Sequence, residues 1–272
     1  MELRGARVLV TGASSGIGAA LAADLGAAGA TVGLVARREG LLAEVLAVAK
    51  RAGACPKSRY WVADLADVAH AEDVARAAWD AFGHLDALVN NAAVPKRRHA
   101  TALDGDELDL VLRVNASSPA RMALAVLPRM LARGAGCIVN VGSLGGRMGI
   151  GGEAAYCASK FALSGFTESL AIDLARTGVR AHLVTPGPFD TGIWDQPGED
   201  AAPYDGPKYP PSQASAAIVA VLRGDAGFET VVPADLGAVV EWKAANLDAY
   251  LAGATAMAAG GASARSDGGD GG

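Results

Sequence analysis

A tyrosine and a lysine stand four positions apart in a short, otherwise small and apolar stretch of the chain. The stretch reads AAYCASKF at 154–161 and contains Tyr156 and Lys160. Residues four apart are neighbours on one face of a helix, so the two groups can act on one molecule. A nearby ammonium lowers the pKa of a phenol, which is about 10 in a free tyrosine. The pair therefore suits acid–base chemistry, although an aromatic ring and a solvated charge also share helix faces without any function.

A glycine-rich turn near the N-terminus predicts a partner for this chemistry. Residues 7–18 read RVLVTGASSGIG, a strand followed by a turn and the beginning of a helix. Glycines in such a turn let the backbone approach a pyrophosphate, which the N-terminus of the helix attracts. The spacing is GxxxGxG instead of the commoner GxGxxG, and loop glycines are often only turn formers. The position in the chain nevertheless predicts dinucleotide binding by Gly12, Ser14, Ser15, Gly16, Ile17 and Gly18.

The end of the second expected strand bears on which dinucleotide binds. A carboxylate at this position would bind the ribose 2′-hydroxyl and repel a 2′-phosphate. The sequence TVGLVARRE places Ala36 there, followed by Arg37 and Arg38. Because a guanidinium matches the geometry of a phosphate, the sequence predicts NADP(H) in preference to NAD(H). The alternative is that the two arginines only begin a solvated helix.

The elements that must position these residues alternate regularly along the chain. Short β-branched runs predict strands at 7–10, 31–35, 60–63, 87–90, 137–141 and 180–184. Longer segments of helical period predict helices at 17–28, 40–52, 68–82, 106–133 and 154–176. Repeated strand–helix–strand units imply a parallel sheet with helices on both faces. The predicted fold class is therefore α/β, a single Rossmann-type domain over residues 1–259 with a doubly wound parallel β-sheet.

The regular alternation ends after Thr185. Residues 186–211 contain seven prolines and several aromatic side chains. A loop of this length is usually functional or disordered, and we expect this one to fold over the substrate as a lid. A last helix at 212–223 and a last strand at 229–232 follow. The end, 260–272, is rich in Gly, Ser and Asp and is predicted to be a disordered tail.

Composition narrows the classes of partner. The 272 residues are 51% hydrophobic with a formal net charge of −5, which offers no basic face to nucleic acid. The N-terminus has no signal peptide, and no apolar run approaches the roughly 20 residues that span a bilayer, so we expect a soluble protein. Three widely spaced cysteines without CxxC pairs indicate a reduced, cytoplasmic compartment. The four histidines lack metal-ligand spacing, and no metal is predicted.

Several motifs occur in the order seen in the short-chain dehydrogenase/reductase family. They are TGASSGIG at 11–18, NNAA at 90–93, Asn115, Ser143, YCASK at 156–160 and PGPFDT at 186–191. The resemblance covers roughly residues 5–235. It implies hydride transfer between NAD(P) and a carbonyl or alcohol, and a homodimer or homotetramer formed through the helices at 106–133 and 154–176. The segment 143–171 also resembles the 17β-hydroxysteroid dehydrogenases within the family.

The resemblance implies a role for each matching residue. Tyr156 resembles the catalytic acid/base, and Lys160 the residue that lowers its pKa and holds the nicotinamide ribose. Ser143 resembles the hydroxyl that orients the carbonyl, and Asn115 the asparagine that supports a proton-relay water. The remaining implied cofactor contacts are Asp64 with Leu65 near the adenine, Asn91 with Ala92 beside the turn, and Pro186, Gly187 and Thr191 over the nicotinamide.

Two positions depart from the family pattern. NNAA ends in alanine where glycine is usual, a small change, whereas PGPFDT has Pro188 and Phe189 where a smaller aliphatic pattern is usual. The second departure bears on the shape of the substrate. A basic segment, KRRH at 96–99, follows NNAA and is interpreted as a solvated loop, with a position at the pocket mouth as the alternative.

The expected substrate pocket is largely apolar. Acidic residues in the 186–211 loop disfavour strongly anionic substrates. We therefore expect a neutral, largely apolar ketone, aldehyde or alcohol, and a steroid-like molecule or a secondary-metabolite ketone would fit this description. The predicted substrate residues are Ser143, Leu144, Met148, Tyr156, Phe189 and Trp194.

Two alternatives to a reductase or dehydrogenase remain open from the sequence. The chain could be a non-catalytic, dinucleotide-binding regulatory protein, although such a protein needs no proton relay. It could also be a dehydratase or an epimerase on the same fold. Net consumption of the cofactor would disfavour the epimerase, because an epimerase regenerates its cofactor in each cycle.

Overall fold

The computed structural model of the protein describes residues 1–266, and side chains as far as residue 256. Within these residues a parallel seven-stranded sheet has the strand order β3-β2-β1-β4-β5-β6-β7. The strands are β1 (Arg7–Thr11), β2 (Thr31–Ala36), β3 (Arg59–Val62), β4 (Ala87–Asn90), β5 (Gly136–Val141), β6 (Val179–Pro186) and β7 (Glu229–Val232). The predicted α/β class and doubly wound parallel sheet are therefore confirmed.

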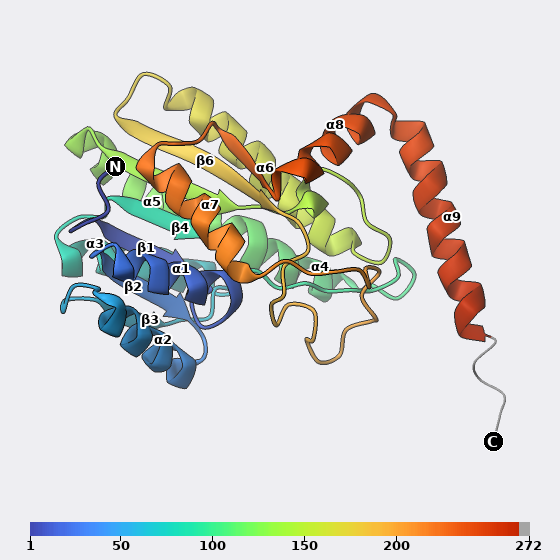
Figure 1. The fold of residues 1–272 in the computed structure, drawn as a ribbon, viewed down its shortest axis with the longest axis horizontal. Helices are drawn as coiled ribbons and strands as arrows, with labels where there is room; N and C mark the ends of the chain where they lie inside the picture. Colours follow the sequence, from blue (N-terminus) through green and yellow to red (C-terminus); the bar gives the residue numbers. More distant parts are fainter. Residues whose placement is uncertain (267–272) are drawn as a thin grey trace.

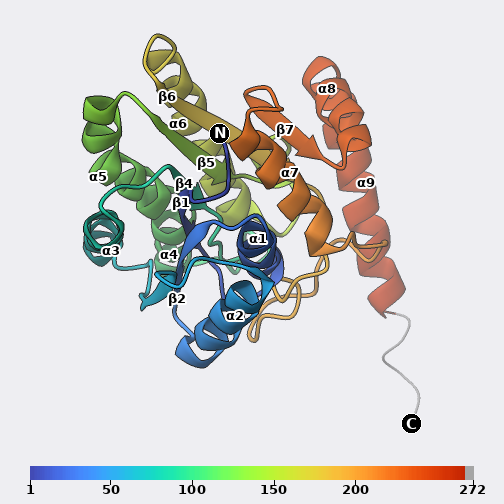
Figure 2. The same cartoon turned by 60° about the vertical axis from the view of Figure 1, so that its left-hand side comes forward.

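Helices cover both faces of the sheet, as Figures 1 and 2 show. One face carries α1 (Gly16–Ala27), α2 (Glu39–Ala52) and α7 (Pro211–Arg223). The other face carries α3 (Val68–Phe82), α4 (Gly105–Leu112), α5 (Ser118–Arg133) and α6 (Ala154–Asp173). Two hydrophobic clusters, one on each side, contain most of the buried side chains. Strands buried on both faces explain why β2 and β4 read as continuous apolar runs instead of alternating.

The strand order fixes where a ligand can bind. The chain proceeds outward from β1 to β3 and then returns to β4, which pairs with β1 on its other side. The connections leaving β1 and β4 therefore diverge to opposite faces and open a crevice at the carboxyl edge of the sheet. The glycine-rich turn follows β1 at this edge, and Asn91 follows β4. The topology thus brings together motifs that lie about 80 residues apart.

A chain of buried polar side chains fixes α6 against the sheet. The Asn90 side-chain amide donates to Oδ1 of Asn140 on β5 (2.8 Å), and Asn140 in turn donates to Oγ1 of Thr167 on α6 (2.8 Å). All three residues are buried. Because unpaired polar groups inside a core are costly, these bonds favour one register of the helix over the strands. The orientation of α6 decides where Tyr156 and Lys160 point.

The helix predicted at 106–133 is interrupted. Residues Arg113–Ser117 form a π-helical turn between α4 and α5. Pro119, near the beginning of α5, has no backbone N–H and cannot donate to the carbonyl one helical turn earlier, which is that of Asn115. A local widening of the helix is a common response to such a missing bond. The prediction of one continuous helix was wrong at this point, which is where a predicted site residue lies.

Two C-terminal helices were not predicted. They are α8 (Gly237–Ala245) and α9 (Leu247–Ser266), and Figure 1 shows α9 extending away from the sheet. Lys243 on α8 lies over the ring of Phe161 on α6, 5.6 Å from its centroid. The segment predicted as a tail, 260–272, begins inside α9, and residues 267–272 lie outside the described part of the chain. None of the described helices combines the length and the apolarity needed to cross a membrane.

Candidate active site

The glycine-rich turn is packed so closely that side chains at two positions would not fit. Gly12 and Gly16 have φ values of 65° and 56°, the left-handed region that residues with a side chain rarely adopt. A Cβ atom on Gly12 would lie 2.7 Å from the Cα of Ala92, and one on Gly16 would lie 2.9 Å from Cγ2 of Thr191. The turn is therefore pressed between the end of β4 and the loop after β6, and its backbone forms one wall of the site.

Asn91 braces the turn from β4. Its side-chain amide donates to the carbonyl of Thr11 (2.9 Å), and its backbone N–H donates to Oγ1 of the same threonine (3.0 Å). The backbone N–H of Ala92 also donates to that hydroxyl oxygen (3.1 Å). Thr11 is thus a positioning residue that the sequence analysis did not identify. Its place as the last residue of β1, immediately before the first glycine, is the signal that would have indicated it.

One of the two arginines after β2 reaches back to the turn. The Arg38 guanidinium donates to Oγ of Ser14 (3.0 Å) and to Oγ of Ser15 (2.8 Å). Arg37 is exposed and makes no such bond to the turn. Both arginines line the cavity described below. A positive charge held beside two hydroxyls at the end of β2 can bind a phosphate group.

Asp64 and Leu65 follow β3 at the same edge of the sheet. Oδ1 of Asp64 accepts from the backbone N–H of Ala66 (3.0 Å), which fixes the carboxylate at the start of the loop. Leu65 is buried, whereas Asp64 is exposed toward solvent. Both line the cavity, on the side that Ala36 and Ala63 also form. The arrangement leaves an apolar surface with one carboxylate at its edge.

Ser143, Tyr156 and Lys160 lie together at the carboxyl end of β5. Ser143 follows β5 in an extended conformation, and its hydroxyl accepts from the backbone N–H of Gly145 (3.1 Å). Lys160 Nζ lies 5.8 Å from the centroid of the Tyr156 ring and donates to the carbonyl of Val141 (2.8 Å). The pair on α6 therefore faces the strand end at which Ser143 stands.

Burial controls the ionisation of both catalytic candidates on α6. It raises the pKa of the Tyr156 phenol above its usual value, while a hydrogen bond with Ser143 acts in the opposite direction. Burial also lowers the pKa of Lys160 to about 7, because the ammonium has lost most of its hydration. Near neutral pH the lysine therefore exists in both protonation states. A charged lysine is predicted to lower the pKa of the Tyr156 phenol, whereas burial raises that pKa. The two effects therefore oppose each other, and the first is present only while Lys160 is protonated.

Asn115 is held inside the π-helical turn. Its side-chain amide donates to the carbonyl of Val94 (2.8 Å) and to Oγ of Ser159 (3.1 Å), and its Oδ1 accepts from the backbone N–H of Val94 (2.8 Å). The residue is fully buried. The amide connects the loop after β4 with α6, one residue before Lys160. Asn115 lies behind the cavity wall, which its neighbour Val114 helps to form.

These residues surround one continuous cavity of about 700 Å³. Its volume lies within the range of pockets for small molecules and cofactors. Of the predicted residues, Gly18 and Asn115 do not line it: a Cβ on Gly18 would lie 2.4 Å from the carbonyl oxygen of Gly12, so this glycine serves the packing of the turn. The predicted residues that line it are Gly12, Ser14, Ser15, Gly16, Ile17, Arg37, Arg38, Asp64, Leu65, Asn91, Ala92, Ser143, Leu144, Met148, Tyr156, Lys160, Pro186, Gly187, Phe189, Thr191 and Trp194.

Several residues of the loop 186–211 line this cavity, and we call the loop the lid. It is internally packed: the ring of Phe189 lies 6.0 Å from that of Tyr209, and the ring of Trp194 lies 6.2 Å from that of Tyr204. The indole N–H of Trp194 donates to the carbonyl of Phe189 (2.6 Å). The aromatic residues that made the loop unusual in the sequence thus stabilise its shape.

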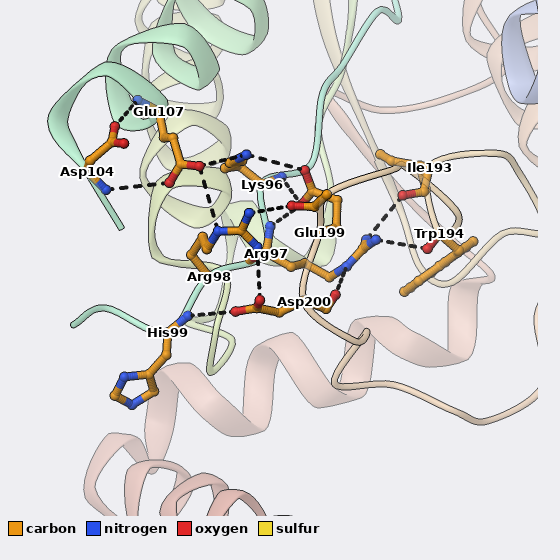
Figure 3. Close-up of polar contacts among 11 residues, drawn as sticks. Lys96, Arg97, Arg98, His99, Asp104, Glu107, Ile193, Trp194, Glu199 and Asp200 are labelled. Atoms are coloured by element: carbon orange, nitrogen blue, oxygen red, sulfur yellow. Dashed lines mark hydrogen bonds and ion pairs between the residues drawn. The ribbon is translucent and has the colours of Figure 1, made fainter. Parts of the chain in front are cut away.

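The basic segment 96–99 holds the lid, as Figure 3 shows. The Arg97 guanidinium is buried and donates to three lid carbonyls, those of Ile193 (3.1 Å), Trp194 (2.8 Å) and Asp200 (3.1 Å). Arg98 forms an ion pair with the carboxylate of Asp200 (2.9 Å). The interpretation of this segment as a solvated loop was wrong, because the lid supplies acceptors from a hundred residues further along the chain.

The backbone of the basic segment contributes as well. Lys96 has a φ of 107°, a backbone conformation that residues with a Cβ atom rarely adopt. Its N–H and that of Arg97 both donate to one carboxylate oxygen of Glu199 in the lid. The Lys96 ammonium pairs with Glu107 on α4 (2.7 Å). The bonds to the lid, together with this ion pair, offset the local backbone strain.

The cavity fits an elongated ligand that carries phosphate groups at one end. A tightly packed glycine turn, the start of α1 and the guanidinium of Arg38 line one part, and Ser143, Tyr156 and Lys160 line the other. Helix N-termini and guanidinium groups attract phosphate, whereas the second part offers proton donors under an aromatic lid. These are the requirements of a dinucleotide whose reactive end meets a second, smaller molecule.

Comparison with known proteins agrees with this geometry. The family model described as "short chain dehydrogenase" matches residues 6–202. The chain belongs to the short-chain dehydrogenase/reductase family. Members are NAD(P)-dependent oxidoreductases that interconvert alcohols and carbonyl compounds, and the parallel sheet with its cavity at the carboxyl edge is the fold of that family.

Individual relatives extend over most of the chain. A D-threitol dehydrogenase from Mycolicibacterium smegmatis is 37% identical over 226 residues, which cover 80% of this chain and 86% of that protein. A short-chain dehydrogenase/reductase from Burkholderia phymatum, solved with NAD, superposes with a TM-score of 0.81 at 26% identity and covers 92% of this chain and 96% of that chain.

A metagenomic short-chain oxidoreductase, solved with NADP, has a TM-score of 0.72 at 31% identity and covers 85% of this chain and 98% of that chain. Short-chain dehydrogenases with either dinucleotide thus resemble this one, so the likeness leaves the choice between NAD and NADP to the residues at the end of β2. The relatives also add no support to the local resemblance of residues 143–171 to the 17β-hydroxysteroid dehydrogenases.

Proposed function

We propose that this short-chain dehydrogenase/reductase is an NADP(H)-dependent enzyme that interconverts a neutral, largely apolar ketone or aldehyde and the corresponding alcohol. The observation that carries the proposal is the single cavity that joins the glycine turn and Arg38 to Ser143, Tyr156 and Lys160. The catalytic domain comprises residues 1–259, with residues 186–211 as its lid. The apolar side chains of Leu144, Met148 and Trp194 support a largely apolar substrate.

The proposed mechanism assigns a proton to Tyr156. When bound, the nicotinamide supplies or accepts the hydride at the reacting carbon. Tyr156 gives its proton to the carbonyl oxygen during reduction and takes a proton from the alcohol during oxidation. The Ser143 hydroxyl donates to the same oxygen, where negative charge develops. The N–H of Gly145 donates to the Ser143 oxygen and orients the hydroxyl, whose proton is directed toward the Tyr156 side and can be donated to the substrate oxygen.

Lys160 and Asn115 support the proton transfer in this proposal. A charged Lys160 on the same helix face stabilises the phenolate that Tyr156 becomes after it has given up its proton. Asn115 holds the loop after β4 and Ser159 in place through three hydrogen bonds, which fixes the environment of the lysine. The lid excludes water from the reacting atoms and thereby strengthens each of these interactions.

Arg38 is the proposed ligand for the 2′-phosphate of NADP. The proposal is supported by its bonds to two hydroxyls of the turn and by the alanine, instead of a carboxylate, at position 36. The other proposed cofactor contacts are those predicted from the sequence: the turn, Asp64 with Leu65, Asn91 with Ala92, and the lid residues Pro186, Gly187 and Thr191 over the nicotinamide. Thr191 already touches the turn at Gly16, which supports this arrangement.

Absorbance at 340 nm tests the proposal. A panel of neutral ketones and aldehydes is offered to the purified protein with NADPH and, separately, with NADH. We expect NADPH to be consumed in the presence of at least one class, and the Tyr156→Phe variant to lose at least a thousandfold in kcat. Unchanged turnover in that variant would contradict the mechanism. An epimerase or a dehydratase would convert its substrate without net loss of NADPH.

We also propose that the protein forms a homodimer or homotetramer in the cytoplasm. Large apolar side chains remain exposed on α5 and α6, among them Leu124, Leu131 and Ile172, and Ile172 is 71% exposed. An apolar strip of this kind on two neighbouring helices is suited to self-association. The three cysteines are free thiols, in keeping with a reducing compartment. Light scattering coupled to size-exclusion chromatography measures the oligomeric state directly.

A further inference from the structure

The carboxylate of Glu153 lies at the substrate end of the cavity. The proposed reaction does not use this carboxylate. The residue is only 8% exposed, yet it lines the same cavity as Tyr156, Met148 and Ile150. It occupies the position before the first residue of α6, where an acidic side chain usually caps the helix. Here its side chain makes no capping hydrogen bond. Its backbone is fixed, because its N–H donates to the carbonyl of Ile150 (3.1 Å).

Nothing in the described part of the chain satisfies this carboxylate. Within residues 1–256 no group donates a hydrogen bond to it and no cation lies within 4 Å of its oxygens. The charge of the Arg97 guanidinium acts on Glu153, but the N–H groups of this guanidinium donate to lid carbonyls. Burial and the neighbouring carboxylate of Glu199 raise the pKa of Glu153, and the charge of Arg97 opposes them.

The Glu153 side chain is largely buried but lines the cavity, and its oxygens are not among the fully buried polar atoms that lack a partner, so a group in the cavity can reach the carboxylate and supply the hydrogen bond that the protein does not. A hydroxyl group satisfies this carboxyl in either protonation state, because it can both donate and accept. An ammonium is disfavoured by the positive charge of Arg97, which already acts on Glu153. A substrate carboxylate is disfavoured by Glu153 itself and by Glu199. A hydroxyl group is therefore the ligand group that suits this position best.

The position also limits where on the substrate that hydroxyl can be. Glu153 precedes Tyr156 by three residues, and side chains at this spacing have Cβ atoms about 5–6 Å apart on one helix face. The two side chains also interact electrostatically, since the charge of Glu153 raises the pKa of Tyr156. A substrate oxygen bound to Tyr156 and a hydroxyl bound to Glu153 are then separated by one or two carbon–carbon bonds.

We propose that Glu153 binds a hydroxyl group next to the reacting carbon and so selects hydroxylated ketones and polyols over plain ketones and alcohols. The inference rests on the proposed function and narrows its substrate class: a neutral molecule with an apolar side toward Met148 and Trp194 and a hydroxylated side toward Glu153. Glu153 is a specificity-determining residue in this account and takes no part in the proton transfer to the carbonyl oxygen.

A pair of matched substrates tests the proposal. The kcat/KM of the enzyme with NADPH is measured for 2-hydroxycyclohexanone and for cyclohexanone. We expect the native enzyme to prefer the hydroxylated ketone by at least tenfold, and Glu153→Ala to abolish that preference while it retains activity on cyclohexanone. Glu153→Gln, which keeps a hydrogen-bonding side chain, retains part of the preference. Glu168→Gln, an exposed carboxylate on the same helix, serves as the control and leaves the preference unchanged.

Equilibrium binding separates this proposal from the reaction itself. Calorimetry of Tyr156→Phe with NADP⁺, with and without Glu153→Ala, compares trans-1,2-cyclohexanediol with cyclohexanol in the absence of turnover. Tighter binding of the diol that depends on Glu153 supports the subsite even if no ketone is reduced, in which case only the proposed reaction fails. Equal preference for the two ketones in the native enzyme, or a diol preference that survives Glu153→Ala, overturns the subsite.

Discussion

The ammonium nitrogen of Lys160 donates a 2.8 Å hydrogen bond to the backbone oxygen of Val141, the last residue of β5. The lysine is 1% exposed, and no carboxylate in the described residues lies within ion-pair distance of it. Among the described residues, this carbonyl and the Tyr156 ring, whose centroid lies 5.8 Å from the ammonium nitrogen, are thus a limited compensation for the lost hydration of a charge at this position. Burial consequently lowers the pKa of Lys160 to about 7, and the charge beside Tyr156 can be gained or lost near neutral pH.

The first prediction concerns stability against pH. Lys160 has a pKa of about 7 when folded, far below the value of about 10.4 in an unfolded chain. Between these two values the unfolded state binds the extra proton, so this group makes the free energy of unfolding rise with pH. Its contribution is about 1 kcal/mol per pH unit. We expect Lys160→Met to lose that rise when urea unfolding of the cofactor-free protein is followed from pH 7 to 9.

The comparison needs a lysine that is already hydrated in the folded protein. Lys50, exposed near the end of α2, provides it. Lys50→Met is expected to retain the slope of the native protein, because the Lys50 ammonium is exposed to solvent in the folded protein as it is in the unfolded chain. If the free energy of unfolding rises with pH equally in Lys160→Met and in the native protein, Lys160 does not have a lowered pKa in the folded protein.

The second prediction concerns cofactor choice. Removing the guanidinium in Arg38→Ala should raise the KM for NADPH by about ten- to a hundredfold, as expected for the loss of a charge-assisted bond to phosphate. The KM for NADH should change little, since NADH lacks the 2′-phosphate. Arg37→Ala is the matched neighbour: its guanidinium is exposed and has no bond to the turn, so a smaller effect is expected. A larger loss in Arg37→Ala would reverse the assignment.

Local patterns in the sequence were enough to predict the sheet and to select residues that the fold brings to one cavity, while their cofactor contacts stay a prediction. The strand ends and the turn residues Gly12 and Gly16 depend on neighbours a few positions away, and the parallel topology then brings Asn91 to the same edge. The bonds from Arg97 to the lid connect residues about a hundred positions apart, and no periodicity marks such a pair. Glu153 was overlooked because a lone carboxylate at a helix start usually caps the helix.

The interrupted helix at 106–133 shows that local periodicity can also mislead within a single element. Continuous helical periodicity over 106–133 concealed the effect of Pro119, whose missing N–H allows the π-helical turn that contains Asn115. The helices α8 and α9 were missed because Ala- and Gly-rich sequence gives little amphipathic pattern. The sequence therefore predicted what depends on local preference, and the remainder depends on which distant segments supply hydrogen-bond partners.

The third prediction concerns the lid. Arg97→Met keeps the length of the side chain but removes the bonds to the carbonyls of Ile193, Trp194 and Asp200. We expect amide hydrogen exchange in 193–200 to become at least tenfold faster and kcat/KM for the ketone to fall by about ten- to a hundredfold. The dissociation constant of NADPH should change much less, because the Arg97 guanidinium is bonded to the lid and not to the glycine turn or Arg38.

Arg98→Met is the matched control for the lid. Its guanidinium is less buried than that of Arg97: it pairs with Asp200 and Glu107 and donates to one lid carbonyl, that of Gly198, instead of three, and ion pairs near the surface contribute little to stability. Hydrogen exchange in the lid should therefore increase less than in Arg97→Met. Equal protection of the lid in Arg97→Met and in the native protein would show that the three carbonyl bonds do not hold it.

The fourth prediction concerns the contact between the glycine turn and the lid. In Gly16→Ala the new Cβ would lie 2.9 Å from Cγ2 of Thr191, and the backbone would keep a φ of 56° that alanine disfavours. We expect the dissociation constant of NADPH, measured by fluorescence titration, to rise by at least tenfold. Thr191→Ser removes only Cγ2. The double variant Gly16→Ala/Thr191→Ser should therefore recover the part of the NADPH affinity that is lost through the collision with Cγ2, and should retain the loss that is due to the positive φ.

The size of that recovery separates the two causes. Strain from a positive φ alone costs an alanine roughly 1 kcal/mol, which lowers affinity by about fivefold when the free turn relaxes and the bound cofactor restores this φ, and this part should remain in the double variant. Gly40→Ala, in the first turn of α2, has no atom within 4 Å of the added Cβ and no positive φ, so it should bind NADPH as the native protein does. If Thr191→Ser gives no recovery in the Gly16→Ala background, the lid does not press on the turn when the cofactor is bound.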